Sequence, residues 1–78
     1  MLDCLQPSTF VFMNINEIFG RKVREKRLAL KISQETLANM ADIDRTYLPD
    51  IEKGKRNISL IVAEKIANAL NVPLKELL

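Results

Sequence analysis

From residue 14 onward, apolar positions recur at the three- and four-residue spacing of helices that bury one face. The first stripe predicts a helix that begins behind a capping asparagine, Asn14 or Asn16, and runs to about residue 30. Its apolar positions are Ile15, Ile18, Phe19, Val23 and Leu30. Alternating strand patterns are absent apart from a short stretch at residues 9–13. The chain is therefore predicted to be all-α.

Three further helices are predicted, each behind a residue whose side-chain oxygen can accept a hydrogen bond from a free backbone amide. Ser33 precedes a helix of residues 34–40, Asp44 one of residues 45–52, and Ser59 one of residues 60–70. Pro73 separates the last of these from a final apolar turn at residues 74–78. The positions expected to face inward are Leu37, Ala38, Leu48, Ile51, and a clear stripe of Leu60, Ala63, Ile66, Ala67 and Leu70.

Length and composition fit one small globular domain. Seventy-eight residues, 47% hydrophobic and 28% charged, are ordinary values for such a domain. No run approaches the roughly 20 apolar residues that cross a bilayer, and residues 1–13 lack the pattern of a secretory signal, so a cytoplasmic protein is expected. Residues 1–13 are expected to form an N-terminal extension, as a flexible tail, an arm or a strand used in contacts, ahead of a domain of residues 14–78.

The chain offers few residues for catalysis. It has no histidine, which removes the commonest general acid or base, and its two glycines form no glycine-rich loop. Its one cysteine, Cys4, has no second thiol or imidazole with which to form a disulfide or hold a metal. Carboxylate chemistry is the one catalytic class left open. We expect no enzyme, no cofactor and no metal.

The net charge of +2 is small, but the basic residues are concentrated. Residues 20–56 hold ten of the twelve Lys and Arg residues against six acidic ones, a local excess of four positive charges. Such a concentration suits a surface that binds a polyanion. Ordinary solvated helix faces explain it equally well, so charge alone decides nothing.

Several segments together resemble one family. They are Arg24 and Arg27, residues 33–38 (SQETLA), residues 43–48 (IDRTYL), residues 51–57 (IEKGKRN) and residues 66–72 (IANALNV). This pattern resembles the XRE-type helix-turn-helix regulators, the family of phage repressors and Cro. The resemblance implies a compact five-helix bundle of the lambda-repressor-like type that binds double-stranded DNA. Residues 44–47 and 56–60 are most similar to restriction–modification controller proteins, which implies a homodimeric transcriptional regulator with a pseudo-palindromic operator.

The same resemblance implies that the predicted helix of residues 45–52 enters the major groove. Arg45, at its start, is the main candidate for reading a base, because a guanidinium can donate two hydrogen bonds to guanine. Thr46 is expected to meet a thymine methyl or a polar base edge. Tyr47 and Asp50 complete the set of candidate base-reading residues. Tyr47 has two further interpretations, a phosphate contact through its hydroxyl or packing between helices, and Asp50 either accepts from a cytosine amino group or stays solvated.

A second group is expected to contact the DNA backbone and to supply affinity more than sequence choice. Gln34 belongs to it, because free amides at a helix start suit a phosphate. The other members are Lys53, Lys55, Arg56 and Asn57, with Arg21 and Lys22 at the edge. Arg27 and Glu52 have a different role, because the family pairs these positions as an internal ion pair between the first and third helices.

Three residues depart from the family pattern. Pro49 lies inside the predicted third helix, where it removes the amide that would donate to the carbonyl of Arg45, so this helix is expected to be bent or tightened. Asp42 and Lys31 stand where the family has glycine. Asp tolerates the left-handed backbone conformation better than most residues, so strain is expected mainly at Lys31.

The apolar end of the chain has two interpretations. Either it forms the interface of a homodimer or it closes the core of the monomer; its residues are Leu70, Val72, Leu74 and Leu77. Two other functions also remain open, the antitoxin or autorepressor of a toxin–antitoxin pair and a helical protein–protein adaptor. A neighbouring toxin gene would identify the first, and a protein partner retained after Arg45→Ala would identify the second.

Overall fold

The computed structural model describes residues 14–78, and the expectations for residues 1–13 lie outside this range. The described residues form four α-helices and one short 3-10 turn, namely α2 (Ile15–Ala29), α3 (Gln34–Ala41), α4 (Tyr47–Glu52), α5 (Leu60–Leu70) and η2 (Leu74–Leu77). The all-α class is confirmed for these residues. The fifth helix expected from the family is a single 3-10 turn.

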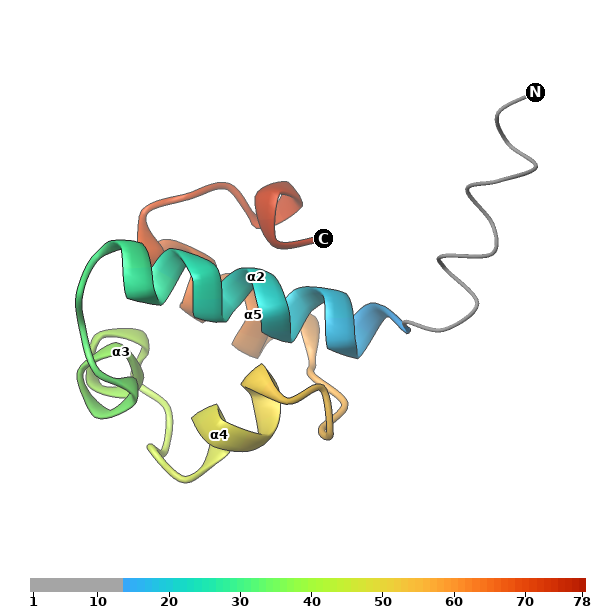
Figure 1. Ribbon diagram of the computed structural model, residues 1–78, viewed down its shortest axis with the longest axis horizontal. Helices are drawn as coiled ribbons and strands as arrows, with labels where there is room; N and C mark the ends of the chain where they lie inside the picture. The colour runs from blue at the N-terminus through green and yellow to red at the C-terminus, as the bar shows by residue number, and fades with distance from the viewer. Residues whose placement is uncertain (1–13) are drawn as a thin grey trace.

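The long helix α2 crosses the molecule, with α3 and α4 on one side of it and η2 on the opposite side (Figure 1). It packs against α4, η2 and α5, while α3 packs against α5. None of the helices in residues 14–78 has the length and apolar character needed to span a bilayer.

Three of the helices begin at the residues that the sequence predicted. Asn14 and Glu17 form a reciprocal pair, in which the Asn14 side chain accepts from the Glu17 amide (2.9 Å) and the Glu17 carboxylate accepts from the Asn14 amide (3.0 Å). Ser33 accepts from the amide of Thr36 at 3.0 Å, and Ser59 accepts from an amide in the first turn of α5 at 3.1 Å. Each cap satisfies a backbone amide that has no partner inside its helix.

Helix α4 begins later than predicted. Arg45 and Thr46 lie in the turn ahead of it, which corrects the prediction that they open the helix. Asp44 holds this turn, since its carboxylate accepts from both the amide and the hydroxyl of Thr46, each at 3.0 Å. Pro49 has no amide for the carbonyl of Arg45, which instead accepts from the amide of Leu48, three residues on, at 3.3 Å. The missing donor therefore tightens the first turn.

Three non-glycine residues with a left-handed backbone conformation lie at or just after the ends of α2, α3 and α5. Asp42 (φ 59°) caps α3 and Asn71 (φ 60°) caps α5. Lys31, with φ 59°, sits in the turn between α2 and α3 and carries the strain expected of it. The family's glycine conformation is thus kept at Asp42 and Lys31 without glycine.

The core takes side chains from all five elements. Its twelve buried apolar residues are Phe19, Val23, Leu37, Ala38, Ala41, Leu48, Ile51, Ala63, Ile66, Ala67, Leu70 and Leu77. The helical stripes extend further than the core, however. Leu60 is 77% exposed, Ile15 56% and Leu30 50%, although all three were expected to face inward. All three lie at or next to helix ends.

Gly20 marks the closest approach of α2 to α4. A Cβ atom at this position would collide with the backbone carbonyl oxygen of Ile51 and would lie 2.9 Å from that of Glu52. The absence of a side chain therefore lets the last turn of α4 rest directly on the backbone of α2, and this contact sets the position of α4.

Candidate nucleic-acid interface

An internal ion pair fixes the end of α4. The guanidinium of Arg27 donates from Nε to Glu52 at 2.7 Å and from Nη2 at 3.1 Å, and its Nη1 donates to the carbonyl of Ile32 at 2.9 Å. The side chains of Arg27 and Glu52 are only 10% and 3% exposed. Hydrogen bonding to Glu52 raises the pKa of Arg27 above its ordinary value, with burial opposing it, so the guanidinium stays charged.

Gln34 also contacts the ion pair of Arg27 and Glu52. Its side-chain amide donates to Glu52 at 3.1 Å, so Glu52 receives hydrogen bonds from both α2 and α3. This contact places Gln34, the first residue of α3, beside the end of α4. The three helices around the turn are thereby joined through one carboxylate.

The turn ahead of α4 presents its side chains to solvent. Arg45 has a side chain that is 68% exposed, and its one ion pair among the described residues is a long contact of 3.5 Å with Glu35, which is 63% exposed. A pair of this kind contributes little stability, so Arg45 is free to exchange partners. The hydrogen bonds from Thr46 lower the pKa of the Asp44 carboxyl below its usual value, so the turn depends on an ionised Asp44.

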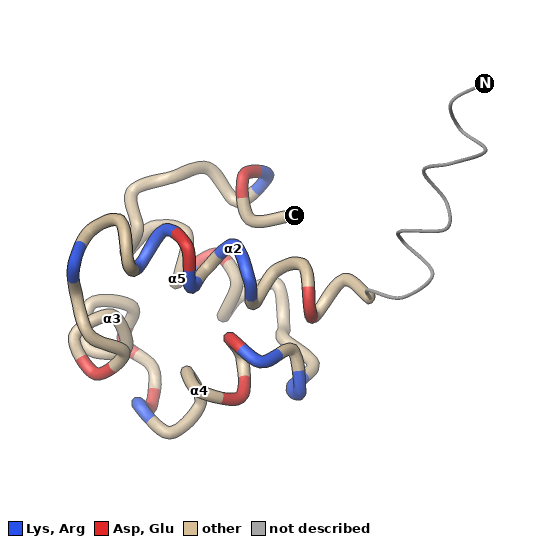
Figure 2. Tube along the Cα trace, in the orientation of Figure 1, with Lys and Arg blue, Asp and Glu red and all other residues tan. Residues whose placement is uncertain are grey.

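The loop of residues 53–57, which follows α4, is a basic loop that carries Lys53, Lys55 and Arg56. Figure 2 shows Lys and Arg at both ends of α4, in the turn before it and in the loop after it. Lys53 and Lys55 are exposed, and neither forms an ion pair within residues 14–78. The amide of Lys55 donates to the carbonyl of Asp50 at 2.9 Å, which ties the start of the loop to the helix.

The loop is also attached to the beginning of α2. The side chain of Asn57 accepts from the side-chain amide of Asn16 at 2.8 Å. Gly54, with φ 75°, packs so closely on Glu17 that a Cβ atom would lie 2.6 Å from the Glu17 Cγ. Asn57 was predicted to contact the DNA backbone. Its side-chain oxygen instead accepts a hydrogen bond within the protein, and this bond attaches the basic loop to α2.

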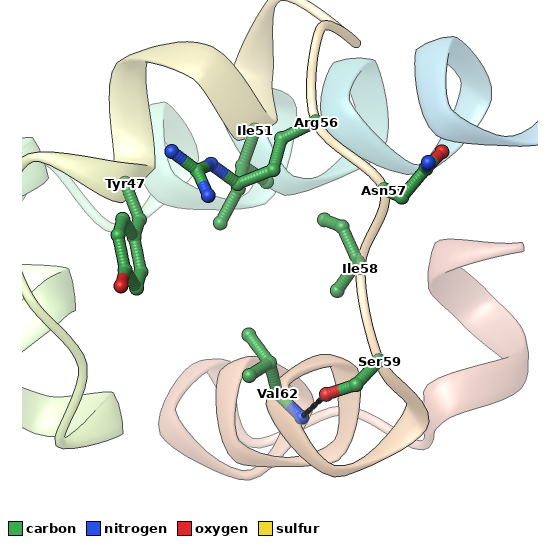
Figure 3. A pocket seen from close by; sticks show the side chains of 7 residues that line it. All are labelled: Tyr47, Ile51, Arg56, Asn57, Ile58, Ser59 and Val62. Atoms are coloured by element: carbon green, nitrogen blue, oxygen red, sulfur yellow. Dashed lines mark hydrogen bonds between the residues drawn. The ribbon is translucent and has the colours of Figure 1, made fainter.

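Tyr47, Asp50 and Arg56 lie together. The Arg56 guanidinium carbon is 4.4 Å from the centroid of the Tyr47 ring, and Arg56 Nη2 is 4.0 Å from an Asp50 carboxylate oxygen. Arg56 reaches across from the loop toward Tyr47 at the rim of a hollow of about 190 Å³ (Figure 3). Asp50, expected to meet a base or stay solvated, is thus half-exposed beside an arginine. The sequence did not predict this cluster.

Lys22, one of the predicted contacts to the DNA backbone, lies elsewhere. Lys22 donates to the carbonyl of Leu78 at 3.2 Å, so it lies on the side of α2 that carries the C-terminus, away from α4 (Figure 1). The structure therefore does not bring Lys22 to the basic loop. Arg21, next to it, is exposed on α2.

The residues expected at a dimer interface divide into two kinds. Leu70 (4% exposed) and Leu77 (0%) belong to the core of the protomer, while Val72 and Leu74 are partly buried against it. The exposed apolar side chains are others, namely Leu60 (77%), Ile61 (70%), Leu78 (49%) and Ile15 (56%). Ile15, Leu60 and Leu78 line one hollow of about 220 Å³ together with Phe19, Ile58 and Ala63. Helical periodicity alone assigned Leu60 to the core and so missed this surface.

Known proteins are similar to this chain in sequence and in fold. Residues 23–77 match the helix-turn-helix family. Control protein C.BamHI of Bacillus amyloliquefaciens is 53% identical over 66 residues, 83% of this chain and 82% of that protein. Control protein C.MunI of a Mycoplasma species is 47% identical over 60 residues, 76% of this chain and 81% of that protein.

Among solved structures, the restriction-modification controller protein C.AhdI from Aeromonas hydrophila superimposes with a TM-score of 0.78 at 43% identity. The match covers 81% of this chain and 96% of that one. The chain therefore belongs to the helix-turn-helix family and, within it, to the family of these control proteins.

Proposed function

We propose that this chain is a sequence-specific DNA-binding transcriptional regulator, a controller protein of a restriction–modification system. The observation that carries the proposal is the surroundings of α4. An exposed arginine lies in the turn ahead of it, and the loop behind it carries lysines that form no ion pair with any residue from 14 to 78. The names of its relatives favour a controller protein over an antitoxin or an adaptor. The proposed role is regulatory, without catalysis, and its DNA partner makes the cytoplasm the expected compartment.

In this proposal the two ends of α4 have different tasks. Arg45, which is 68% exposed, exchanges its weak contact with Glu35 for a base edge in the major groove. Thr46 lies beside it in the same turn and contributes to sequence choice. Lys53, Lys55 and Arg56 contact phosphates and supply salt-dependent affinity. The buried pair of Arg27 and Glu52 keeps the last residue of α4 in a fixed position on α2.

We also propose that the regulator works as a homodimer. Monomers seldom expose a large contiguous apolar patch. Here Ile15, Leu60 and Leu78, which line one hollow, are 56%, 77% and 49% exposed, and Ile61, next to Leu60 in the sequence, is 70% exposed. A second copy would cover this surface, while Leu70 and Leu77 close the core of each protomer beneath it. A two-fold dimer would read a pseudo-palindrome whose half-sites are about 34 Å apart or another whole number of turns.

Binding to a DNA duplex from the region upstream of its own gene tests the proposal. We expect fluorescence anisotropy to show tight binding whose logarithmic affinity falls linearly with the logarithm of salt concentration. A scrambled duplex of the same composition should bind more weakly, and Arg45→Ala should remove this preference. Lys75→Ala, on the opposite side of α2, is the matched control and should change neither value. Equal, salt-independent binding to both duplexes would refute the proposal.

A further inference from the structure

Arg56 and Tyr47 form a stack that links the basic loop to the first residue of α4. The guanidinium carbon lies 4.4 Å from the ring centroid, inside the range of about 6 Å over which a cation is attracted to an aromatic face. Figure 3 shows the arginine extended toward the ring, although its backbone lies in the loop beyond α4. The contact therefore fixes the direction of a long side chain that the loop alone would leave free.

A second side chain of α4 acts on the same guanidinium. Asp50 lies one turn after Tyr47 and approaches Nη2 of Arg56 at 4.0 Å. At this distance, and with both side chains about half-exposed, the ion pair is weak, so it adds only a second restraint to the aromatic contact. Tyr47 and Asp50 together hold Arg56 against the outer face of α4.

The stack leaves the hydrogen-bonding groups of Arg56 available. A cation–aromatic contact replaces no N–H···O hydrogen bond, and Arg56 donates no such bond to any residue from 14 to 78. An arginine held in this way keeps its donors for a phosphate and loses less rotamer freedom when it binds one. Lys53 and Lys55, by comparison, have no such partner within residues 14–78.

We propose that Tyr47 is a positioning residue, which acts on DNA through Arg56 and not through its own hydroxyl group. Its aromatic ring orients the guanidinium toward the phosphate backbone before DNA arrives. The inference rests on the proposed DNA-binding function and adds to it a division of labour, because it removes Tyr47 from the set of base-reading residues. It also separates the ring of Tyr47 from its hydroxyl, and this difference can be tested.

A double-mutant cycle in DNA affinity tests the proposal, with the upstream duplex as the probe. Tyr47→Leu should weaken binding by about two- to fivefold, and Tyr47→Phe, which keeps a ring, should bind like the original chain. In a chain that carries Arg56→Ala, Tyr47→Leu should have no further effect. The Arg56→Ala change should itself reduce the salt slope by about one.

The free protein gives an independent readout. The side-chain protons of Arg56 should show a ring-current shift in the NMR spectrum that persists in Tyr47→Phe and disappears in Tyr47→Leu, while circular dichroism confirms that each variant folds. Three results would overturn the inference: no loss in Tyr47→Leu, an equal loss with and without Arg56, or a Tyr47→Phe variant as weak as Tyr47→Leu. If the original chain shows no salt-dependent DNA binding, the proposed function itself fails instead.

Discussion

Arg27 of α2 and Glu52 of α4 meet in a two-pronged ion pair, with N–O distances of 2.7 and 3.1 Å and a Glu52 side chain that is only 3% exposed. Glu52 also accepts from Gln34 of α3. The carboxylate thus connects the three helices that surround the proposed DNA-reading turn. Its removal has consequences for folding before any consequence for binding.

We expect Glu52→Ala to lower the free energy of unfolding by about 3–5 kcal/mol, because it leaves the Arg27 guanidinium without its partner in a nearly buried site. Urea denaturation followed by circular dichroism measures this loss. Glu35→Ala removes the other carboxylate that pairs with an arginine at this turn, but from an exposed pair, and should cost less than about 1 kcal/mol. Similar losses in the two variants would contradict this account of α4.

Gly20→Ala should destabilise the protein although it places a better helix former inside α2. At an open helical position this change stabilises by about 0.5–1 kcal/mol. Here the new Cβ would meet the carbonyl oxygens of Ile51 and Glu52, so we expect a net loss of about 1–3 kcal/mol. Asn68→Ala, at an exposed position of α5, serves as the control and should change stability little. A rise in the melting temperature of Gly20→Ala would show that α2 and α4 are less closely packed than described.

The turn ahead of α4 should respond to acid. The pKa of Asp44 is lowered in the folded state, so its contribution is fully present above the pKa of about 3.9 of an unfolded aspartate. The contribution is lost as the pH falls through the lower, folded value. The difference in melting temperature between the original chain and Asp44→Ala should therefore be largest near neutral pH and shrink at the acidic end. An NMR titration midpoint for Asp44 at or above the usual aspartate value would contradict the prediction.

Polar substitutions at the start of α5 should dissociate the proposed dimer without unfolding the protomer. Leu60 and Ile61 are 77% and 70% exposed, so the double change to serine removes little from the core. Sedimentation equilibrium should show a shift toward monomer. Met40→Ser, which alters an exposed apolar side chain on α3 (52%), should leave the mass unchanged. Leu77→Ala, by contrast, should cost about 2–5 kcal/mol of stability because its side chain is fully buried.

Local signals in the sequence were sufficient for most of the fold. The caps at Asn14, Ser33 and Ser59 depend on side chains next to the amides that they satisfy, and the limits of α5 follow from its cap and from Asn71 and Pro73. The start of α4 was predicted wrongly. There the hydrogen bonds of Asp44 and the missing amide of Pro49 together favour a tight turn over a helical one.

Contacts across the chain could not be derived from spacing. Asn16 and Asn57 are 41 residues apart, and nothing in either segment indicates that they meet. The stack of Arg56 on Tyr47 likewise depends on the path of a loop that carries no periodic pattern. The exposure of Leu60 is a property of the assembled domain, because the spacing within α5 alone assigns this residue to the apolar stripe.

The shortness of α4 has a final consequence. Six residues are far too few for a helix to persist alone in water, so α4 exists only while the rest of the domain holds it. Occupancy of an operator and integrity of the domain are then thermodynamically linked, and DNA should raise the temperature at which the protein melts. For the same reason, warming should release the DNA in the same cooperative transition in which the whole domain unfolds.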